Sequence, residues 1–106
     1  FYPQEIEATV AAASGLVRRG YVAAFSAPDA QGEDQLVVVA ERATGTSRSD
    51  PGPAIAAIRA AVAGRHGVTP GDIRVLPAGA IPRTTSGKLA RRATRTEYLD
   101  GQLRQR

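Results

Sequence analysis

The sequence has no cysteine, methionine or tryptophan, and its 106 residues include one histidine, His66, and one lysine, Lys88. The absence of cysteine excludes disulfide bonds and thiol chemistry. One histidine without cysteine argues against a zinc site and against a Ser–His catalytic triad. A lone histidine near a predicted helix end is typical of a cap or a surface residue, so we predict no metal site.

Long apolar runs are also missing, because no stretch approaches the ~20 residues that a membrane span needs. The chain opens on Phe-Tyr-Pro-Gln-Glu, without a methionine and without a signal-peptide pattern, and this predicts a fragment or a processed chain. The length predicts a single small domain over residues 1–106, with one modest core. A cytoplasmic location without a membrane span is expected.

Charge is distributed unevenly along the chain. Residues 1–53 hold four arginines and seven acids, a net of −3, whereas residues 54–106 hold ten basic residues and three acids, a net of +7. The stretch from Arg83 to Arg95 has five positive charges and no negative one. An anionic partner would therefore meet the domain at this stretch. The alternative is a solvated basic face with no partner.

Hydrophobic patterning predicts three helices and three strands in the order αββαβα. The first helix begins at Pro3 and ends by Gly15, the second begins near Asp50–Pro51 and ends at Gly67, and the third begins near Lys88. The predicted strands are Tyr21–Pro28, Gln35–Glu41 and Ile73–Leu76. This order predicts an α+β fold, a small and mostly antiparallel sheet of about three strands packed with about three helices.

The last helix, from about Lys88, is expected to bury one face. Its buried stripe is predicted to consist of Leu89, Ala93, Thr96, Leu99 and Leu103. Four basic residues, Lys88, Arg91, Arg92 and Arg95, are spaced i, i+3, i+4, i+7 and are therefore expected on one face of the same helix.

The loop before this helix carries the only lysine. Thr84, Thr85, Ser86 and Gly87 form a hydroxyl-rich stretch, in which Ser86 is a candidate helix cap. A Walker A loop is excluded, because Gly79 lies too far before Gly87 and Leu89 follows Lys88 where a magnesium-binding hydroxyl would stand. A lysine in the first helical turn is slightly unfavourable, by a few tenths of a kcal/mol. Lysine also offers a compact charge on a long flexible stem, which reaches oxygens of different groups.

Two blocks of the sequence together resemble the C-terminal domain of acyl-adenylate-forming enzymes: "YPQEIE" (Tyr2–Glu7) and "IPRTTSGKLARR" (Ile81–Arg92). Two more, "RGYVAAF" (Arg19–Phe25) and "RRATRTEYLDG" (Arg91–Gly101), are similar to actinobacterial fatty acyl-AMP ligases, above all to the long-chain members that serve mycolic-acid synthesis. The resemblance covers essentially the whole chain, which is expected to start just after the family's interdomain hinge.

The resemblance implies a lid that works on a larger N-terminal adenylation domain, where ATP, Mg²⁺ and a long-chain fatty acid are mainly bound. Lys88 matches the family's catalytic lysine, which reaches between the substrate carboxylate and the ribose-phosphate oxygens while Thr84–Gly87 lie near the nucleotide. The lid is then expected to rotate for acyl transfer to the phosphopantetheine thiol of an acyl carrier protein or polyketide synthase carrier domain. The chain alone is expected to be an inactive monomer without a cofactor.

Carrier proteins are typically acidic, so Arg91, Arg92 and Arg95 are candidates for docking one. Three alternatives stay open. The chain could belong to an acyl-CoA synthetase, or be an interaction-only domain of the same fold. It could also be a small basic nucleic-acid-binding module, but its two phenylalanines and three tyrosines all lie outside the basic stretch and provide no stacking platform there.

Overall fold

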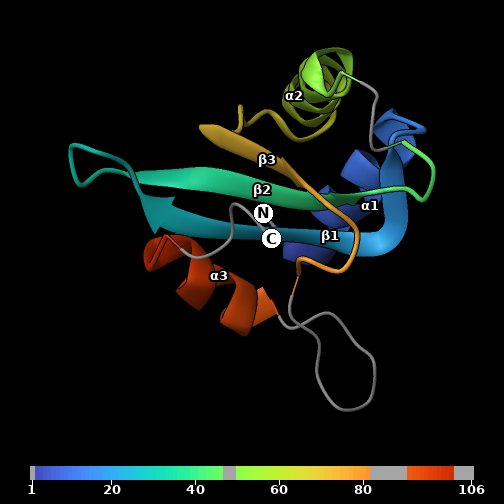
Figure 1. Cartoon of the computed structure of the whole chain (residues 1–106). Helices are drawn as coiled ribbons and strands as arrows, with labels where there is room; N and C mark the ends of the chain where they lie inside the picture. The colour runs from blue at the N-terminus through green and yellow to red at the C-terminus, as the bar shows by residue number, and fades with distance from the viewer. Residues whose placement is uncertain (1, 47–49, 82–90, 102–106) are drawn as a thin grey trace.

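The computed structural model describes residues 2–46, 50–81 and 91–101. Along the chain the elements are α1 (Pro3–Ala13), β1 (Val17–Pro28), β2 (Asp34–Arg42), α2 (Gly52–His66), β3 (Asp72–Leu76) and α3 (Arg91–Leu99). Figure 1 shows the sheet between α2 and α3. The predicted order of elements and the α+β class are confirmed.

The three strands form one mixed sheet in the order β1-β2-β3. β1 and β2 are antiparallel from Val22↔Ala40 to Pro28↔Asp34, as the short connection between them predicts. β3 runs parallel to β2, since α2 carries the chain back across the sheet before β3 begins. β1 starts four residues earlier than predicted, at Val17, and its register shifts between Val17 and Val22.

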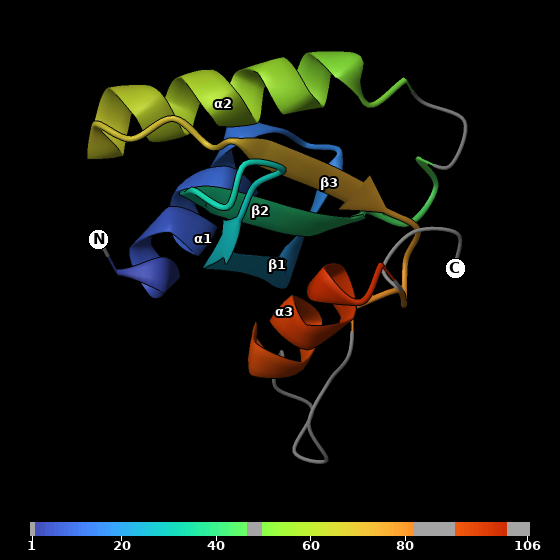
Figure 2. The ribbon, with the colours of Figure 1, turned by 90° about the vertical axis from the view of Figure 1, so that its left-hand side faces the viewer.

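Both faces of the sheet are covered, which is why β1 and β2 contain continuous buried runs rather than alternating ones. On one face, α1 and α2 pack through Ile6, Val10, Ile58 and Val62 against Val38 and its neighbours. On the other face, a second cluster joins Phe25, Val37, Val39 and Leu76 to Ala80, Ile81 and the ring of Tyr98. Figure 2 shows α2 and α3 on opposite sides of the sheet.

The first two helices follow their sequence signals closely. Pro3 lies in the first turn of α1, where its missing N–H is no loss, and Glu5 adds a negative charge at the same end. α2 buries Ala54, Ile58 and Val62 and ends at Gly67, whose φ of 71° is left-handed. In the described part of the chain, no helix combines the length and apolar character that a membrane crossing requires.

The predicted buried stripe of α3 is wrong. Ala93 and Thr96 are exposed and the Leu99 side chain is 47% exposed, whereas Thr94 is fully buried and Tyr98 partly buried. Leu89 and Leu103 lie outside the described residues. α3 turns residues 91, 94, 95 and 98 towards the sheet, and three of these four are arginine or tyrosine. A prediction from apolar periodicity could not select this face, because polar groups make most of its contacts.

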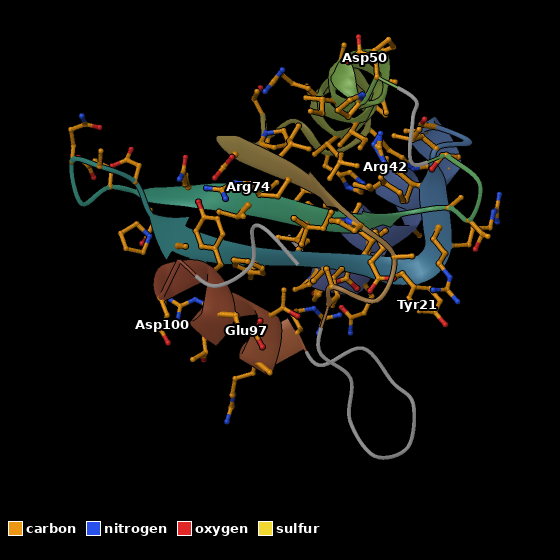
Figure 3. The ribbon with its side chains drawn as sticks, in the orientation of Figure 1. Tyr21, Arg42, Asp50, Arg74, Glu97 and Asp100 are labelled. Carbon is orange, nitrogen blue, oxygen red and sulfur yellow. The ribbon has the colours of Figure 1, made fainter. Side chains whose placement is uncertain are left out.

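Tyr98 links α3 to both outer strands. Its ring meets Phe25 of β1 edge to face, with ring centroids 5.6 Å apart, and its hydroxyl donates to Oδ2 of Asp72 in β3 at 2.6 Å. Arg74, labelled in Figure 3, donates from Nε to the same Oδ2 at 3.0 Å and lies 5.2 Å from the ring centroid of Tyr98. Burial and the bond to Asp72 raise the pKa of Tyr98 to about 12.

Two glycines at the end of α2 predict opposite changes in stability. Gly64 is exposed inside the helix and has open space around it, so we expect Gly64→Ala to stabilise the chain by about 0.5–1 kcal/mol. Gly67→Ala should destabilise it by about 1 kcal/mol, because an L side chain disfavours its positive φ. Thermal unfolding of both variants checks the signs, and a shift of the same sign in both would contradict the assignment of the helix end.

The Tyr98 hydroxyl predicts a distinct alkaline titration. The raised pKa means that the folded state holds this proton more tightly than the unfolded state, whose ordinary value is 10.0. This contribution to stability is complete below pH 10.0 and is lost as the pH rises through about 12. We expect ultraviolet titration of the folded chain to show a phenolate forming near pH 12 that is missing in Tyr98→Phe. Identical titration curves for the wild-type chain and Tyr98→Phe would contradict the raised pKa of Tyr98.

Candidate functional site at the ends of segment 82–90

The predicted catalytic residue Lys88 and the loop residues Thr84, Thr85, Ser86 and Gly87 lie outside the described residues. The segment that holds them, 82–90, leaves β3 through Pro77–Ile81 and enters α3 at Arg91. Both of these ends are described. The candidate site is therefore described through the contacts that hold Ile81 before the segment and Arg91 after it.

A buried carboxylate holds the chain just before the segment. The Glu41 side chain is 0% exposed and lies near the end of β2, on the face that also carries Val37 and Val39. The backbone N–H of Gly79 donates to Oε1 at 2.9 Å and that of Ile81 donates to Oε2 at 3.0 Å. Nη1 of Arg18 lies 3.5 Å from Oε1. Each carboxylate oxygen thus binds a backbone donor, and the path of residues 79–81 is fixed.

A second carboxylate holds the chain just after the segment. Arg91 donates from Nε to Oε2 of Glu7 and from Nη2 to Oε1, each at 2.7 Å. Oε2 of Glu7 also accepts the backbone N–H of Ala24 in β1 at 2.9 Å. The hydrogen bond and charge of Glu7 raise the pKa of Arg91 against the opposing effect of burial. α1, β1 and the first residue of α3 therefore meet at one two-pronged ion pair.

Arg95 extends the same contact one turn further along α3. Its Nε donates to the backbone carbonyl oxygen of Ser26 at 2.7 Å. Ala24 and Ser26 both lie on the edge of β1 that faces away from β2, because β1 is the outer strand of the sheet. Arg91 and Arg95 thus bind groups of this open edge, one through Glu7 and one directly. Arg92, between them in sequence, is exposed.

Neither Glu41 nor Glu7 was predicted from the sequence as part of a site. The sequence does contain a signal for Glu41. This glutamate directly follows the apolar run "LVVVA", and the alternation of side chains along a strand places it on the face of Val37 and Val39. Glu7 stands next to Ile6 in the first helix and has no comparable signal. The partners of both carboxylates lie 40 and 84 residues away in sequence, at Ile81 and Arg91.

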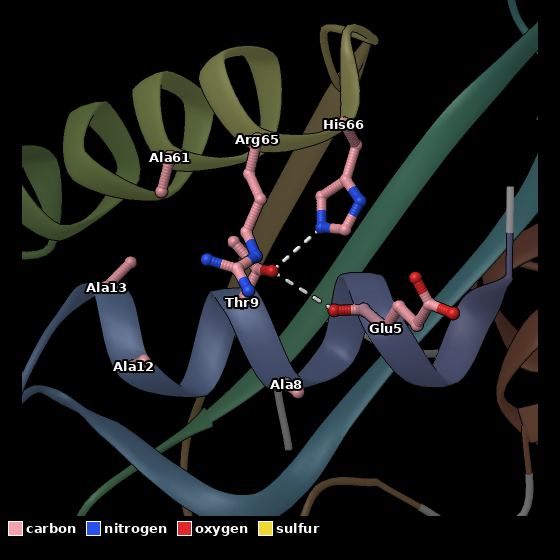
Figure 4. Close-up of a pocket in the computed structure, with 8 residues that line it drawn as sticks. All are labelled: Glu5, Ala8, Thr9, Ala12, Ala13, Ala61, Arg65 and His66. Carbon is pink, nitrogen blue, oxygen red and sulfur yellow. Dashed lines mark hydrogen bonds between the residues drawn. The ribbon is translucent and has the colours of Figure 1, made fainter.

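A groove of about 680 Å³ lies between α1 and α2, on the other face of the sheet from Glu41. Alanines line much of it, and Arg65, His66, Glu5 and Thr9 supply its polar groups. Figure 4 shows His66 reaching from the end of α2 to Thr9 of α1, where Nε2 and Oγ1 are 2.7 Å apart. The only histidine thus connects two helices, consistent with its expected place near a helix end.

Comparison with known sequences gives a consistent assignment. The long-chain-fatty-acid–AMP ligase FadD32 of Mycolicibacterium smegmatis is 49% identical over 97% of this chain, and that of Mycobacterium marinum is 44% identical over the same share. The medium-chain-fatty-acid–[acyl-carrier-protein] ligase JamA of Moorena producens is 36% identical over 98%. The chain spans 18–19% of the length of these relatives. No protein-family model matches it.

Solved structures show the same fold. A structure of McyG A-PCP complexed with phenylalanyl-adenylate has a TM-score of 0.82, with 23% identity over 95% of this chain and 18% of that one. A structure from a study of fatty acyl-adenylate ligases of E. coli and L. pneumophila has a TM-score of 0.73, with 28% identity over 95% of this chain and 17% of that one. By sequence and fold, the chain belongs to the acyl-adenylate-forming enzymes, where it corresponds to the C-terminal domain of the fatty acyl-AMP ligases.

Proposed function

We propose that residues 1–106 form the C-terminal lid domain of a larger ATP-dependent fatty acyl-AMP ligase, in which a separate adenylation domain binds most of the substrates. The observation that carries the proposal is the 49% identity to a long-chain-fatty-acid–AMP ligase over 97% of this chain, although the chain spans only 19% of that relative. The proposed substrate of the whole enzyme is a long-chain fatty acid used for mycolic-acid synthesis. By itself, the lid is a monomer without this activity.

Lys88 is the proposed catalytic residue of the lid. In the adenylation step the fatty-acid carboxylate attacks the α-phosphorus of ATP, the bond to the bridging oxygen breaks, and pyrophosphate leaves. The Lys88 ammonium lies between the attacking carboxylate and the ribose-phosphate oxygens, where it holds the nucleophile in line and stabilises the gathering negative charge. Thr84–Gly87 lie near the nucleotide in this pose.

Mg²⁺ is proposed to bind outside this chain. Among residues 2–46, 50–81 and 91–101, no group of three or more His, Cys, Asp or Glu side chains is arranged to hold a metal ion. The described residues therefore do not fit a metal centre, and the acids nearest to segment 82–90 are already bound to backbone donors and to arginine. Nucleotide and metal ligands are assigned to the adenylation domain.

The acceptor of the acyl group is proposed to be the phosphopantetheine thiol of an acyl carrier protein or a polyketide synthase carrier domain. The relative JamA, named as an acyl-carrier-protein ligase, supports this acceptor. Docking is assigned to α3 through Arg91, Arg92 and Arg95. Arg91 and Arg95 also bind Glu7 and Ser26 within the chain, so exposed Arg92 is the residue that tests the docking most cleanly.

Coenzyme A is the second candidate acceptor. Relatives named as putative fatty-acid–CoA ligases, fadD21 of Mycobacterium leprae and Mycobacterium tuberculosis, are 34–35% identical over 92% of this chain. The carrier-directed reaction is preferred because the fatty-acid–AMP ligases named above are 44–49% identical. The nucleic-acid alternative is not favoured, because two of the three described arginines in the basic stretch contact the chain itself.

Substitution of Lys88 tests the adenylation role in the full-length enzyme. We expect Lys88→Ala to lower the rate of acyl-AMP formation by ~10²–10³, because it removes a charge that acts mainly in the transition state. Lys88→Arg should also be slower than wild type, since a planar fork does not reproduce a point charge on a flexible stem. Pyrophosphate release measures the rate. Wild-type rates in Lys88→Ala would reject the catalytic role of Lys88.

Charge reversal at Arg92 tests carrier docking. We expect Arg92→Glu to slow acyl transfer to the carrier protein by about three- to tenfold at low ionic strength, because a rim charge mainly steers association. Acyl-AMP formation should be unchanged. Arg59→Glu is the matched control, because Arg59 is also exposed but lies on α2, across the sheet from α3. Equal transfer rates in wild type and Arg92→Glu at low salt would reject this docking site.

A further inference from the structure

We propose that Glu41 and Glu7 are positioning residues for Lys88, because they fix the two ends of the segment that carries it. Glu41 holds the entry to segment 82–90, the residues just before it, through Gly79 and Ile81. Glu7 holds the exit, the residue just after it, through Arg91. The inference rests on the proposed catalytic role of Lys88, and it assigns Glu41 and Glu7 a part in the reaction through the groups of this chain that they bind.

At the entry, Glu41 holds the backbone itself rather than a side chain. Its two oxygens accept the N–H groups of Gly79 and Ile81, at 2.9 and 3.0 Å, so the chain is bound at two points up to the residue before segment 82–90. Gly79 turns with a φ of 86°, and Ala80 N–H donates to the carbonyl oxygen of Pro77 at 3.2 Å. The direction in which the chain leaves Ile81 therefore depends on a carboxylate that is 0% exposed.

At the exit, Glu7 holds the first residue of α3. Both prongs of the Arg91 guanidinium bind both oxygens of Glu7, and this geometry fixes orientation as well as distance. Glu7 is itself held by the N–H of Ala24, a fully buried residue of β1. The anchor of α3 is therefore connected to the sheet core, just as Glu41 is.

The Glu41 carboxylate does more than stabilise the fold. A buried carboxylate loses its hydration, and a well-packed apolar residue of similar volume often serves a fold equally well or better. Glu41 lies on the face of the sheet that carries the apolar cluster of Val39, Leu76 and Ile81, so an apolar substitute would match this cluster. What it could not do is accept two backbone N–H groups. The carboxylate provides directional control of the chain at this point.

The reaction supplies a reason for such control. Segment 82–90 contains nine residues, from 82 through 90, and it must deliver one amine to a reaction centre in another domain. A displacement of about 1 Å at a catalytic contact can cost ~10²-fold in rate. Fixing the entry to β2 and the exit to α1 and β1 limits the positions that the amine can sample.

The test uses the full-length enzyme and the variant Glu41→Gln. Glutamine has the same shape, but its amide nitrogen cannot accept a hydrogen bond, so Gly79 or Ile81 loses its acceptor. We expect kcat for acyl-AMP formation to fall about tenfold, with KM for ATP and fatty acid changed less than about twofold, because binding is assigned to the other domain. Glu7→Gln should show the same kinetic pattern, with a smaller loss.

A double-mutant cycle separates positioning from a general structural role. In the Lys88→Ala background, Glu41→Gln should cause no further loss of kcat, because the group it positions is already gone. A full tenfold loss in both backgrounds would overturn the inference. Asp72→Asn is the matched control: it weakens another polar anchor of α3, at Tyr98 and Arg74, away from segment 82–90. It should leave kcat within about twofold, and an equal loss there would also count against the inference.

The outcomes distinguish this inference from the proposed function. If the wild-type full-length enzyme forms no acyl-AMP, the proposed function fails, and if it does but Lys88→Ala is equally fast, the catalytic role of Lys88 fails. If Lys88→Ala is slow while folded Glu41→Gln and Glu7→Gln both keep wild-type kcat, only the positioning role fails. Far-ultraviolet circular dichroism and thermal unfolding establish that each variant is folded, and Glu7→Gln carries the test if Glu41→Gln does not fold, because Glu7 is partly exposed.

Discussion

The α3 side of the domain depends on the hydrogen bonds that the Glu41 carboxylate accepts from the chain after β3. Burying an ionised carboxylate costs several kcal/mol before compensation, and here each oxygen has a backbone N–H as its partner, with Arg18 beside one of them. Removing the acceptor would leave two N–H groups without a partner beneath an apolar cluster, which is costly in its own right. Residues 77–81, which follow β3, are therefore held over the second face of the sheet.

The basic stretch shows why charge in a sequence does not equal charge on a surface. Three of its five positive residues lie in α3, and two of these, Arg91 and Arg95, bind groups along the open edge of β1. An unpaired strand edge favours pairing with another chain, and covering it with a helix is one of the ways in which proteins prevent this. Part of the +7 charge of residues 54–106 thus serves the fold itself.

The sequence predicted the local features and failed at the distant ones. α1, α2 and all three strands were identified, since their signals lie in periodicity, proline, glycine and β-branched runs within a few residues. The buried face of α3 was missed, because Tyr98 and two arginines replace the apolar stripe that periodicity seeks. Glu41 and Glu7 could not be identified as anchors without the fold, since it alone brings them to Ile81 and Arg91. Lys88 was selected through the family resemblance, because its loop alone favoured no function.

The chain has a single lysine beside thirteen arginines, and two arginine contacts show how the two residue types differ in use. Arg91 uses two nitrogens of a planar fork to bind both oxygens of Glu7, and Arg18 stacks 3.7 Å from the ring centroid of Tyr21. A lysine ammonium can reproduce neither arrangement, because it is compact and has no planar face. The partners at these sites are held in place by the fold, and this favours a rigid planar donor. The proposed task of Lys88 is different, since the oxygens around it change position and charge as the acyl-phosphate bond forms. A compact charge on a flexible stem suits that proposed task better than a planar fork does.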